Sequence, residues 1–495
     1  MKSILTSSQM KQCDYNTINY FCIPSLVLME RASESFVSVL TDYIDFDSRV
    51  LVFVGSGNNG GDGVCCARLL HNYGYNAALL LCGDKDKYSP DLNKQLEIAA
   101  KYNIEIASVT DIDNYDVLVD AIFGIGLSRD ITGTYADYIK AFNDAECYKA
   151  AIDIPSGINS DTGCVMGVAC NVDITVTFNY KKPGHLLYPG REYCGYTYIR
   201  DIGINDNSFL DDITPGIFNF ENVDLHLLDN RKSDSNKGDF GKVLIIAGQK
   251  DMSGAAYLSA KAALRMGAGL VKVYTFLDNG PILQRQLPEC LISTYDSYDE
   301  EKLSKELNWS NVCVIGPGIG QSDDATSMTR YVLDNYEKPL IIDADAINII
   351  SKDLSMLNCN NHNRIITPHL GEMRRLIQID ISQIKEDMIK VASDFANSHE
   401  IITVLKAAST VTSTLDGKSY INTSGNNGMS TAGSGDVLTG IIAGLIANNI
   451  DCDIAAGLGV YIHGLCGDEA ALNTNEHYLM ASDIIDSIRN VIRGL

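Results

Sequence analysis

Short apolar runs alternate with helical patterns along the first half of the chain. Val, Ile and Leu dominate these runs, which lie at residues 50–54, 77–81, 117–123, 150–154 and 174–178. This alternation is typical of strands that are joined by crossover helices in a mostly parallel sheet. Ahead of the first run, residues 24–40 place apolar side chains at helical spacing, which predicts an amphipathic helix on the sheet.

A second alternating series begins at Lys242. Its apolar runs read VLIIAG, VKVYTF, VCVIGPGIG, PLIIDAD, RIITPH and ITVLKA, and a long apolar helix follows the sequence GSGD. A polar, turn-rich tract at residues 205–237 separates the two series. The pattern therefore predicts two α/β domains, residues 1–225 and 226–495, each built on a mainly parallel sheet.

Composition restricts the class of protein. A chain of 495 residues exceeds the size of a single core, and its formal net charge of -24 excludes nucleic acid and anionic membranes as partners. The 14 cysteines are scattered without a C-x-x-C motif, which favours free thiols in a reducing compartment. No apolar stretch approaches 18 residues. We expect a cytoplasmic protein that is either a small-molecule enzyme or a protein-binding module.

The first candidate site is the loop in VLVFVGSGNNGGDG, which matches the dinucleotide pattern G-x-G-x-x-G. Its backbone N–H groups and the following helix can approach an anion, although a tight turn without a ligand explains the pattern equally well. The loop has no lysine. It carries Asn58, Asn59 and Asp62, whose oxygens and amides suit an uncharged ring or a hard cation.

Other predicted strand ends carry polar groups as well. Asp120 closes one strand, residues 124–130 follow it, and Asp153 and Ser156 follow the next strand. In an open α/β sheet the carboxyl ends of the strands form the ligand crevice, so these loops can converge. Asp120 and Asp153 can also be helix caps, and Ser156 a turn residue. Their joint occurrence with the asparagine loop favours a binding site.

These motifs carry a family resemblance. With GSGNNGGDG, VDAIFGIGLSRDITG, AIDIPSGINSDTG and KKPGHLLYPG, preceded by LMERA, most of residues 1–220 resemble the NAD(P)H-hydrate epimerase family. The resemblance implies a Rossmann-like three-layer domain that interconverts the R and S epimers of NAD(P)H hydrated on its nicotinamide ring, called NAD(P)HX. The nicotinamide nucleotide is then the substrate and not a hydride carrier.

The same resemblance implies roles for individual residues. Asp153 faces the hydrated ring as the acid–base group, and a potassium ion is held by Asn59, Asp120 and Ser156, whose oxygens suit a hard cation. The nucleotide is lined by Asn58, Asn59, Gly60, Gly61, Asp62, Gly124, Ile125, Gly126, Leu127, Ser128, Arg129 and Asp130. Two interpretations of Lys182 remain open, a phosphate contact and a surface lysine.

In the second half the strongest signal is NTSGNNGMSTAGSGDVLTGIIAGLIA. The start of this apolar helix offers free N–H groups to anionic oxygens, and Asp436 can accept a hydroxyl proton during phosphoryl transfer. A carboxylate that only complements the helix dipole is the alternative. Lys406 offers a cation to phosphates. His369 follows a predicted strand and can bind a ribose or an amide, or be a structural histidine.

Together with KGDFGKVLIIAG, SGAAYLSAKAALRMGAGLV and IIDADAINII, these segments make residues 230–495 similar to the ADP- or ATP-dependent NAD(P)H-hydrate dehydratase family of the ribokinase-like superfamily. The resemblance implies that a nucleotide, with magnesium, phosphorylates the ring hydroxyl of the S-hydrate, and that phosphate then leaves. Asp436 is the implied base, and at a helix start we expect it to stay ionised. The implied hydrate contacts are Ala255, Gly318, His369 and Asp436, and the implied nucleotide contacts are Lys406, Ala407, Ala408, Ser409, Thr410 and Gly435.

Two alternatives stay open at this point. The second half can be a vitamin or sugar kinase, which would accumulate a phosphorylated product. The first half can be a nucleotide sensor without activity of its own. On the main interpretation the partners are NAD(P)HX and an adenine nucleotide, and we expect a homo-oligomer.

Overall fold

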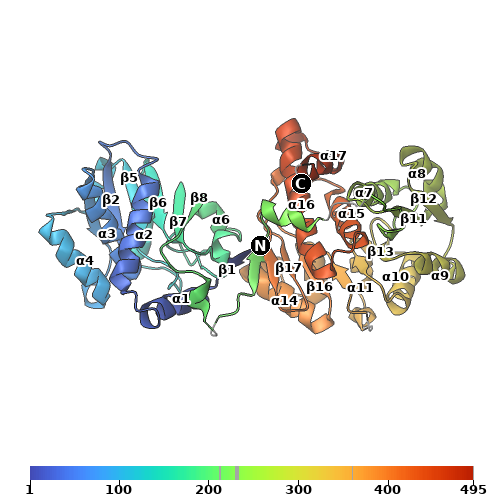
Figure 1. Cartoon of the computed structure of the whole chain (residues 1–495), viewed down its shortest axis with the longest axis horizontal. Coiled ribbons are helices and arrows are strands. Elements are labelled where there is room, and N and C mark those ends of the chain that lie inside the picture. The colour runs from blue at the N-terminus through green and yellow to red at the C-terminus, as the bar shows by residue number, and fades with distance from the viewer. Residues whose placement is uncertain (211–212, 229–232, 359–360, 494–495) are drawn as a thin grey trace. The chain divides into compact units, whose positions relative to one another are not determined.

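The structure is a computed structural model that describes residues 1–210, 213–228, 233–358 and 361–493. The chain divides into two compact units, residues 3–216 and residues 217–495 with Met1 and Lys2 (Figure 1). Residues 217–225, which the sequence assigned to the first domain, lie in the second unit. The reason is that strand β9 (Ile217–Asn219) pairs with β18 (Ser419–Ile421) in the second unit's sheet.

The first unit is built on a seven-stranded parallel sheet of order β4-β3-β2-β5-β6-β7-β8. The strands are β2 (Arg49–Val54), β3 (Asn76–Leu81), β4 (Glu105–Ile106), β5 (Val117–Ala121), β6 (Tyr148–Ile152), β7 (Ile174–Phe178) and β8 (Tyr196–Arg200). From the adjacent pair β2 and β5, the chain winds outward in opposite directions. Loops that follow these two strands therefore meet at a topological switch point, the usual place for a ligand.

Helices cover both faces of this sheet. Helices α2 (Ser25–Leu40), α3 (Asn58–Asn72) and α4 (Pro90–Lys101) pack on one face, and α5 (Thr134–Asp144) packs on the other. The alternation along β2 explains the layers, since Val50, Val52 and Val54 belong to the first core and Leu51 and Phe53 to the second. The predicted three-layer Rossmann-like arrangement is confirmed. Helix α6 (Gly190–Tyr193) is a single turn.

Helix α1 (Ser7–Asn19) was not predicted from the sequence. Two of the side chains that it buries, Asn16 and Thr17, are polar. Asn16 Nδ2 donates to the main-chain oxygen of Ser208 at 2.9 Å, and Thr17 Oγ1 donates to Ser208 Oγ at 2.9 Å. Because distant partners satisfy these groups, the helix packs without the apolar periodicity that would have shown it.

The second unit holds an eleven-stranded sheet of order β1-β9-β18-β17-β16-β15-β14-β13-β10-β11-β12. The seven neighbouring strands β16, β15, β14, β13, β10, β11 and β12 run parallel to one another. Strand β17 is antiparallel to both of its neighbours, β16 and β18. The remaining bounds are β1 (Lys2–Ile4), β10 (Lys242–Ile246), β11 (Leu270–Phe276), β12 (Leu291–Tyr295), β13 (Val312–Ile315), β14 (Leu340–Ile342), β15 (Arg364–Ile366), β16 (Ile402–Leu405) and β17 (Val411–Ser413).

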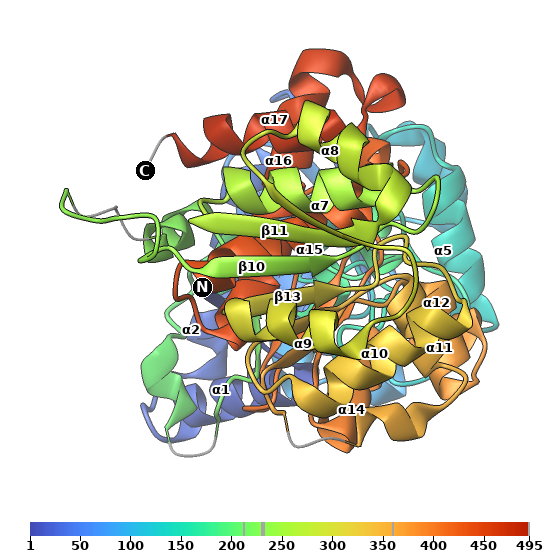
Figure 2. The ribbon, with the colours of Figure 1, turned by 90° about the vertical axis from the view of Figure 1, so that its right-hand side faces the viewer.

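Helices flank this sheet on both faces, with α7 on one side and α9 and α10 on the other (Figure 2). Gly440 lets helix α15 pack closely on α7, because it has no side chain. An added Cβ there would lie only 2.2 Å from the main-chain oxygen of Ser259. In the described residues no helix is long and apolar enough to cross a membrane. The helices are α7 (Ser253–Arg265), α8 (Gly280–Gln286), α9 (Glu300–Trp309), α10 (Asp323–Asn335), α11 (Asp345–Ile350), α12 (Leu370–Ile377), α13 (Ile381–Glu386), α14 (Met388–His399), α15 (Ser434–Ala447), α16 (Cys452–Thr474) and α17 (Ala481–Ile492).

Candidate active sites

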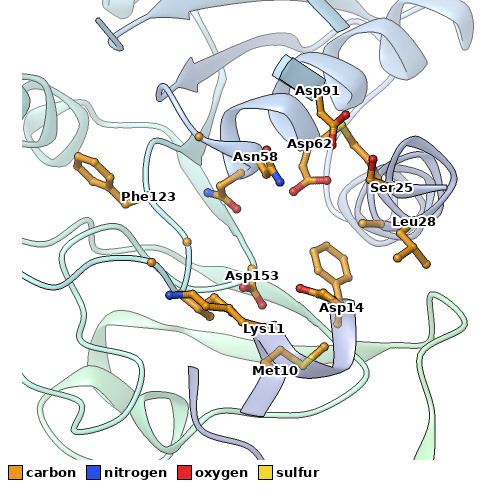
Figure 3. Close-up of a pocket in the computed structure, with 18 of the residues that line it drawn as sticks. Met10, Lys11, Asp14, Ser25, Leu28, Asn58, Asp62, Asp91, Phe123 and Asp153 are labelled. Carbon is orange, nitrogen blue, oxygen red and sulfur yellow. The ribbon is translucent and has the colours of Figure 1, made fainter. Parts of the chain in front are cut away.

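A cavity of about 520 Å³ opens at the carboxyl ends of β2, β5 and β6 in the first unit (Figure 3). It lies at the switch point of the sheet, and helices α1 and α2 form its opposite wall. The structure brings many of the predicted site residues together here. Those that line the cavity are Asn58, Asn59, Asp62, Gly124, Ile125, Gly126, Leu127 and Asp153.

The other residues predicted to line the nucleotide are not among the described residues of the cavity lining: Gly60, Gly61, Ser128, Arg129 and Asp130. The two glycines serve close packing instead. A side chain at Gly60 would meet the Gly55 oxygen at 2.2 Å, and one at Gly61 would meet Met29 Cε at 2.6 Å. They allow α3 to begin directly beside the loop that lines the cavity.

Asp153 is held in place by a buried lysine. It follows β6 with a left-handed φ of 65°, and its Oδ1 accepts from Lys182 Nζ at 2.6 Å and from Thr177 Oγ1 at 2.9 Å. The Lys182 side chain is only 1% exposed, so the interpretation of Lys182 as a surface lysine is wrong. Burial by itself would raise the pKa of Asp153, but the Lys182 ammonium outweighs it and holds this pKa below its usual range.

The predicted potassium ligands lie at two neighbouring points. Ser156 Oγ donates to Asp120 Oδ1 at 2.6 Å, and the Ser156 N–H donates to Asp120 Oδ2 at 2.6 Å. Asn59 lies beside Gly124, and its buried Nδ2 has no hydrogen-bond partner among the described residues. Burial raises the pKa of Asp120 in spite of its bonds to Ser156. A nearby cation would offset that cost of burying the carboxylate.

Two further carboxyl groups point into the cavity, from Asp14 on α1 and Asp62 on α3 (Figure 3). Burial raises the pKa of Asp62 well above its ordinary value. Burial also raises the pKa of Asp14 to about 7, although Lys182 opposes the shift. No local sequence pattern marks Asp14 as a site residue.

In the second unit, the loops after β15 and β16 lie against each other. The Lys406 N–H donates to the Pro368 oxygen at 2.8 Å, and His369 and Lys406 form an isolated parallel bridge. Gly435, at the start of α15, is close enough that a side chain there would meet Lys406 Nζ at 3.4 Å. Three predicted residues from distant segments are thus neighbours.

A buried carboxylate holds Lys406. Lys406 Nζ donates to Asp343 Oδ1 at 2.9 Å. Asp343 also accepts from Thr367 Oγ1 at 2.7 Å and from Thr439 Oγ1 at 2.8 Å. Burial would raise the pKa of Asp343, but Lys406 and these hydroxyls keep it below its usual range. The ammonium is therefore fixed in place beside the start of α15.

Asp436 lies in the first turn of α15, as predicted. Burial and then the charge of Asp343 raise its pKa to about 7, and Lys406 opposes the shift. The expectation that the helix dipole keeps Asp436 fully ionised is therefore wrong. A helix N-terminus stabilises a carboxylate by only about 1 kcal/mol, which loses to burial near a second negative charge.

Ala255 and Gly318 also meet. Gly318 has a left-handed φ of 61°, and a side chain there would lie 3.1 Å from Ala255 Cβ. With Met252, whose Cβ and Cε would both lie 3.6 Å from the added carbon, the pair makes the space between α7 and the loop after β13 narrow.

His369 is the N-cap of α12. Its Nδ1 accepts from the N–H groups of Gly371 at 2.9 Å and Glu372 at 3.2 Å, so the ring proton lies on Nε2. Burial and the Lys406 ammonium lower the pKa of His369, which favours this neutral form. The ring has a structural role, its side chain is 54% exposed, and Nε2 lies 3.4 Å from Glu372 Oε1.

The predicted nucleotide loop folds back on itself after β16. Thr410 Oγ1 donates to the Ala407 oxygen at 3.2 Å and lies 3.4 Å from the Ala407 N–H. Ser409 and Thr410 are buried, whereas Ala408 is exposed. The loop therefore presents backbone, rather than long side chains, beside Lys406.

Comparison with known proteins identifies the family. A family model described as NAD(P)H-hydrate dehydratase matches residues 243–490, and one described as YjeF-related protein N-terminus matches residues 25–184. The bifunctional NAD(P)H-hydrate repair enzyme of Thermofilum pendens is 32% identical over 99% of this chain and 96% of its own. That of Moorella thermoacetica is 34% identical over 99% of this chain and 97% of its own. The chain belongs to the bifunctional NAD(P)H-hydrate repair enzymes.

A solved structure supports the fold of the second unit of this repair enzyme. A ribokinase-like superfamily protein of Enterococcus faecalis superimposes with a TM-score of 0.51 and 28% identity, covering 57% of this chain and 97% of its own. The predicted ribokinase-like fold is confirmed. We call residues 217–495 the dehydratase unit.

Three residues at the two sites of this repair enzyme escaped the sequence analysis or were misread by it. Asp343 lies within the quoted IIDAD segment, and its position directly after a buried strand was a usable signal. Lys182 gave no sign of burial. Asp14 lies on a helix with a polar sequence, and nothing in its local pattern indicates that it reaches a cavity.

Proposed function

We propose that this protein repairs hydrated NAD(P)H in two steps. The first unit, here the epimerase unit, interconverts R- and S-NAD(P)HX, and the dehydratase unit converts the S epimer into NAD(P)H. One observation carries the proposal: relatives that are named bifunctional repair enzymes match this chain over both of its units.

In the epimerase unit we assign proton transfer at the hydrated ring to Asp153. The Lys182 ammonium keeps Asp153 ionised at neutral pH, so this carboxylate is ready to accept a proton. Asn58, Asp62 and the loop from Gly124 to Leu127 offer amide, carboxyl and backbone groups to the nucleotide. A general base of this kind typically contributes about 10² to 10⁴ in rate.

Asn59, Asp120 and Ser156 would hold a potassium ion in the same unit. The oxygens suit a hard cation, because Asp120 is a fully buried carboxylate and the side-chain amide oxygen of Asn59 lies beside Gly124 at the cavity. When bound, the ion supplies positive charge beside the hydrate. The residues themselves fix the two loops through the bonds between Ser156 and Asp120.

In the dehydratase unit Asp436 would take the proton of the ring hydroxyl as it attacks the terminal phosphoryl group of ADP or ATP. Lys406 and the backbone of residues 407–410 and Gly435 would hold the nucleotide, with Ala255, Gly318 and His369 on the hydrate. Magnesium accompanies such nucleotides and spreads the phosphate charge. Loss of phosphate from one ring carbon and of a proton from the adjacent carbon then regenerates the nicotinamide double bond.

We further propose that the protein acts in the cytoplasm as a homo-oligomer on these small molecules alone. The free thiols of the described cysteines support a reducing compartment. Sedimentation velocity of the full chain tests the oligomeric state.

The decisive experiment supplies R-hydrate and S-hydrate separately to the full chain with ADP or ATP, and follows the absorbance of reduced nicotinamide. Asp153→Asn should stop recovery from R-hydrate and spare recovery from S-hydrate. Asp436→Asn should stop both while R-hydrate is still epimerised. Accumulation of a phosphorylated product without free phosphate would instead support a kinase, and undiminished epimerisation by Asp153→Asn would remove Asp153 from the mechanism.

A further inference from the structure

Helix α1 brings a second carboxyl group into the cavity of the epimerase unit. Met10, Asp14 and Ile18 are spaced four residues apart, lie on one face of the helix, and all line the cavity. Asp14 lies on α1 and Asp153 follows β6, and both carboxyl groups are directed into the same space (Figure 3). Asp14 is the only acidic residue of α1, so the helix has no acidic solvent-facing side to which this carboxylate would belong.

The chemistry of epimerisation asks for two proton carriers. One route to inversion of the hydroxyl-bearing ring carbon breaks its C–O bond on one face and re-forms it on the other. A proton given to the hydroxyl lets it leave as water, and the ring nitrogen lone pair stabilises the remaining cation. A second water then attacks the opposite face and gives up a proton. The step balances, because one water leaves and one water enters, and the proton given to the departing hydroxyl is matched by the proton released from the incoming water.

We propose that Asp14 is the second catalytic acid–base residue of the epimerase unit, acting from the face of the hydrated ring opposite to Asp153. In one direction Asp14 protonates the departing hydroxyl and Asp153 takes the proton of the incoming water, and in the other direction their roles are exchanged. This inference rests on the proposed epimerase function.

The surroundings of the two carboxyl groups give them opposite protonation states. Lys182 Nζ, at 2.6 Å, keeps Asp153 ionised, whereas Asp14 forms no ion pair with the described residues and burial raises its pKa to about 7. Such a separation is how enzymes assign an acid and a base to paired carboxyl groups. The charged and titratable groups around Asp14 are Lys11 and Cys13 on its own helix, Asp62 on α3, Asp91 on α4, Asp153 and Lys182 across the cavity, His185 behind Asp153, and Asp206 in the 3₁₀ turn against α1.

The pH dependence follows from these states. Conversion needs Asp14 protonated, so its rate should fall as the pH rises past about 7. It also needs Asp153 ionised, so the rate should fall at acidic pH, below the usual range of a carboxyl group. The profile of kcat/KM for R-hydrate should therefore be bell-shaped.

The test uses the full chain and R-hydrate. Asp14→Asn should lower the conversion rate by about 10² to 10⁴ and remove the fall at high pH, because no group is left to lose its proton. Asp14→Glu should restore part of the rate and the fall at high pH. Dehydration of S-hydrate by the same samples shows that the chain is folded, and Asp42→Asn removes an equal charge from an exposed position of the same unit.

Asp14→Asn with wild-type rate and an unchanged pH profile overturns the proposal. A second outcome also overturns the proposal: Asp14→Glu loses as much conversion rate as Asp14→Asn, and Asp14→Asn keeps the fall in rate at high pH. That outcome would assign Asp14 a structural role alone. Absence of conversion in the wild-type protein would count against the epimerase function itself, which keeps the two failures distinct. Epimerisation in water enriched in heavy oxygen should label the hydroxyl once per inversion, and an unlabelled product would contradict the two-face mechanism.

Discussion

Lys182 and Asp153 form a buried ion pair in the cavity of the epimerase unit, with Nζ 2.6 Å from Oδ1 and the lysine side chain 1% exposed. Thr177 bridges the two groups, since its hydroxyl donates to Asp153 and accepts from Lys182. The lysine is thereby a positioning residue. It fixes both the direction and the charge of the carboxylate that faces the cavity.

The first prediction concerns this pair. Lys182→Met should raise the pKa of Asp153, so the acidic limb of the epimerisation profile should move to higher pH and the rate near neutrality should fall. Breaking a buried pair costs about 3–5 kcal/mol of stability, measurable by denaturant unfolding. Asp153→Asn with Lys182→Met should recover part of that stability. Lys140→Met, at an exposed position of α5, is the control, and an unshifted acidic limb in Lys182→Met would contradict the pairing argument.

The second prediction concerns the cation. Asp120→Ala should abolish potassium binding and weaken the binding of R-hydrate measured by calorimetry in potassium buffer, with Asp113→Ala, an exposed carboxylate of the same unit, as control. In crystals soaked with rubidium, anomalous scattering should appear between Asn59, Asp120 and Ser156. Hydrate affinity that is equal with and without potassium in the wild-type protein would argue against the ion.

The third prediction concerns chemistry in the dehydratase unit. Asp436→Asn keeps the shape of the side chain and removes its basicity, so recovery of NADH from S-hydrate should fall by at least about 10²-fold. Nucleotide affinity by calorimetry should change little, because Lys406 and Gly435 remain. Asp334→Asn, exposed on α10, should leave the rate unchanged. Near-normal dehydration by Asp436→Asn would reduce Asp436 to a helix cap.

The fourth prediction is a pH dependence. Because the pKa of Asp436 is raised to about 7, kcat/KM for S-hydrate should increase as the pH rises through about 7 and then level off. An elevated pKa of an acid means that its ionised form is less stable in the folded state. Asp436→Asn should therefore raise the melting temperature at pH 8 and have little effect on it at pH 5. A lower melting temperature at pH 8 would show that the carboxylate stabilises the fold.

The fifth prediction compares two glycines near the hydrate. Gly318→Ala should lower kcat/KM for S-hydrate and cost about 1–2 kcal/mol of stability, because φ is 61° and the new Cβ would lie 3.1 Å from that of Ala255. Gly254→Ala, where no atom lies within 4 Å of the added carbon, should leave both quantities nearly unchanged. Equal effects of the two substitutions would contradict a narrow site between Ala255 and Gly318.

The sequence by itself determined the layers of both units and the places of many site residues. The apolar runs marked β2, β3, β5, β6, β7 and most strands of the second sheet, since parallel strands buried on both faces are mainly apolar. Asp120, Asp153 and Asp436 were identifiable because polar residues at strand ends and helix starts follow directly in the chain from the elements that place them.

Only the tertiary structure decided what those residues meet. It buried Lys182 against Asp153 and placed Asp14 on the wall of the cavity. It also put Asp343 beside Lys406, although the two residues lie 63 positions apart in the chain. It also raised the pKa of Asp436, which local helix geometry alone would lower. Burial and long-range charge depend on which segments pack together, and no local pattern of residues contains that information.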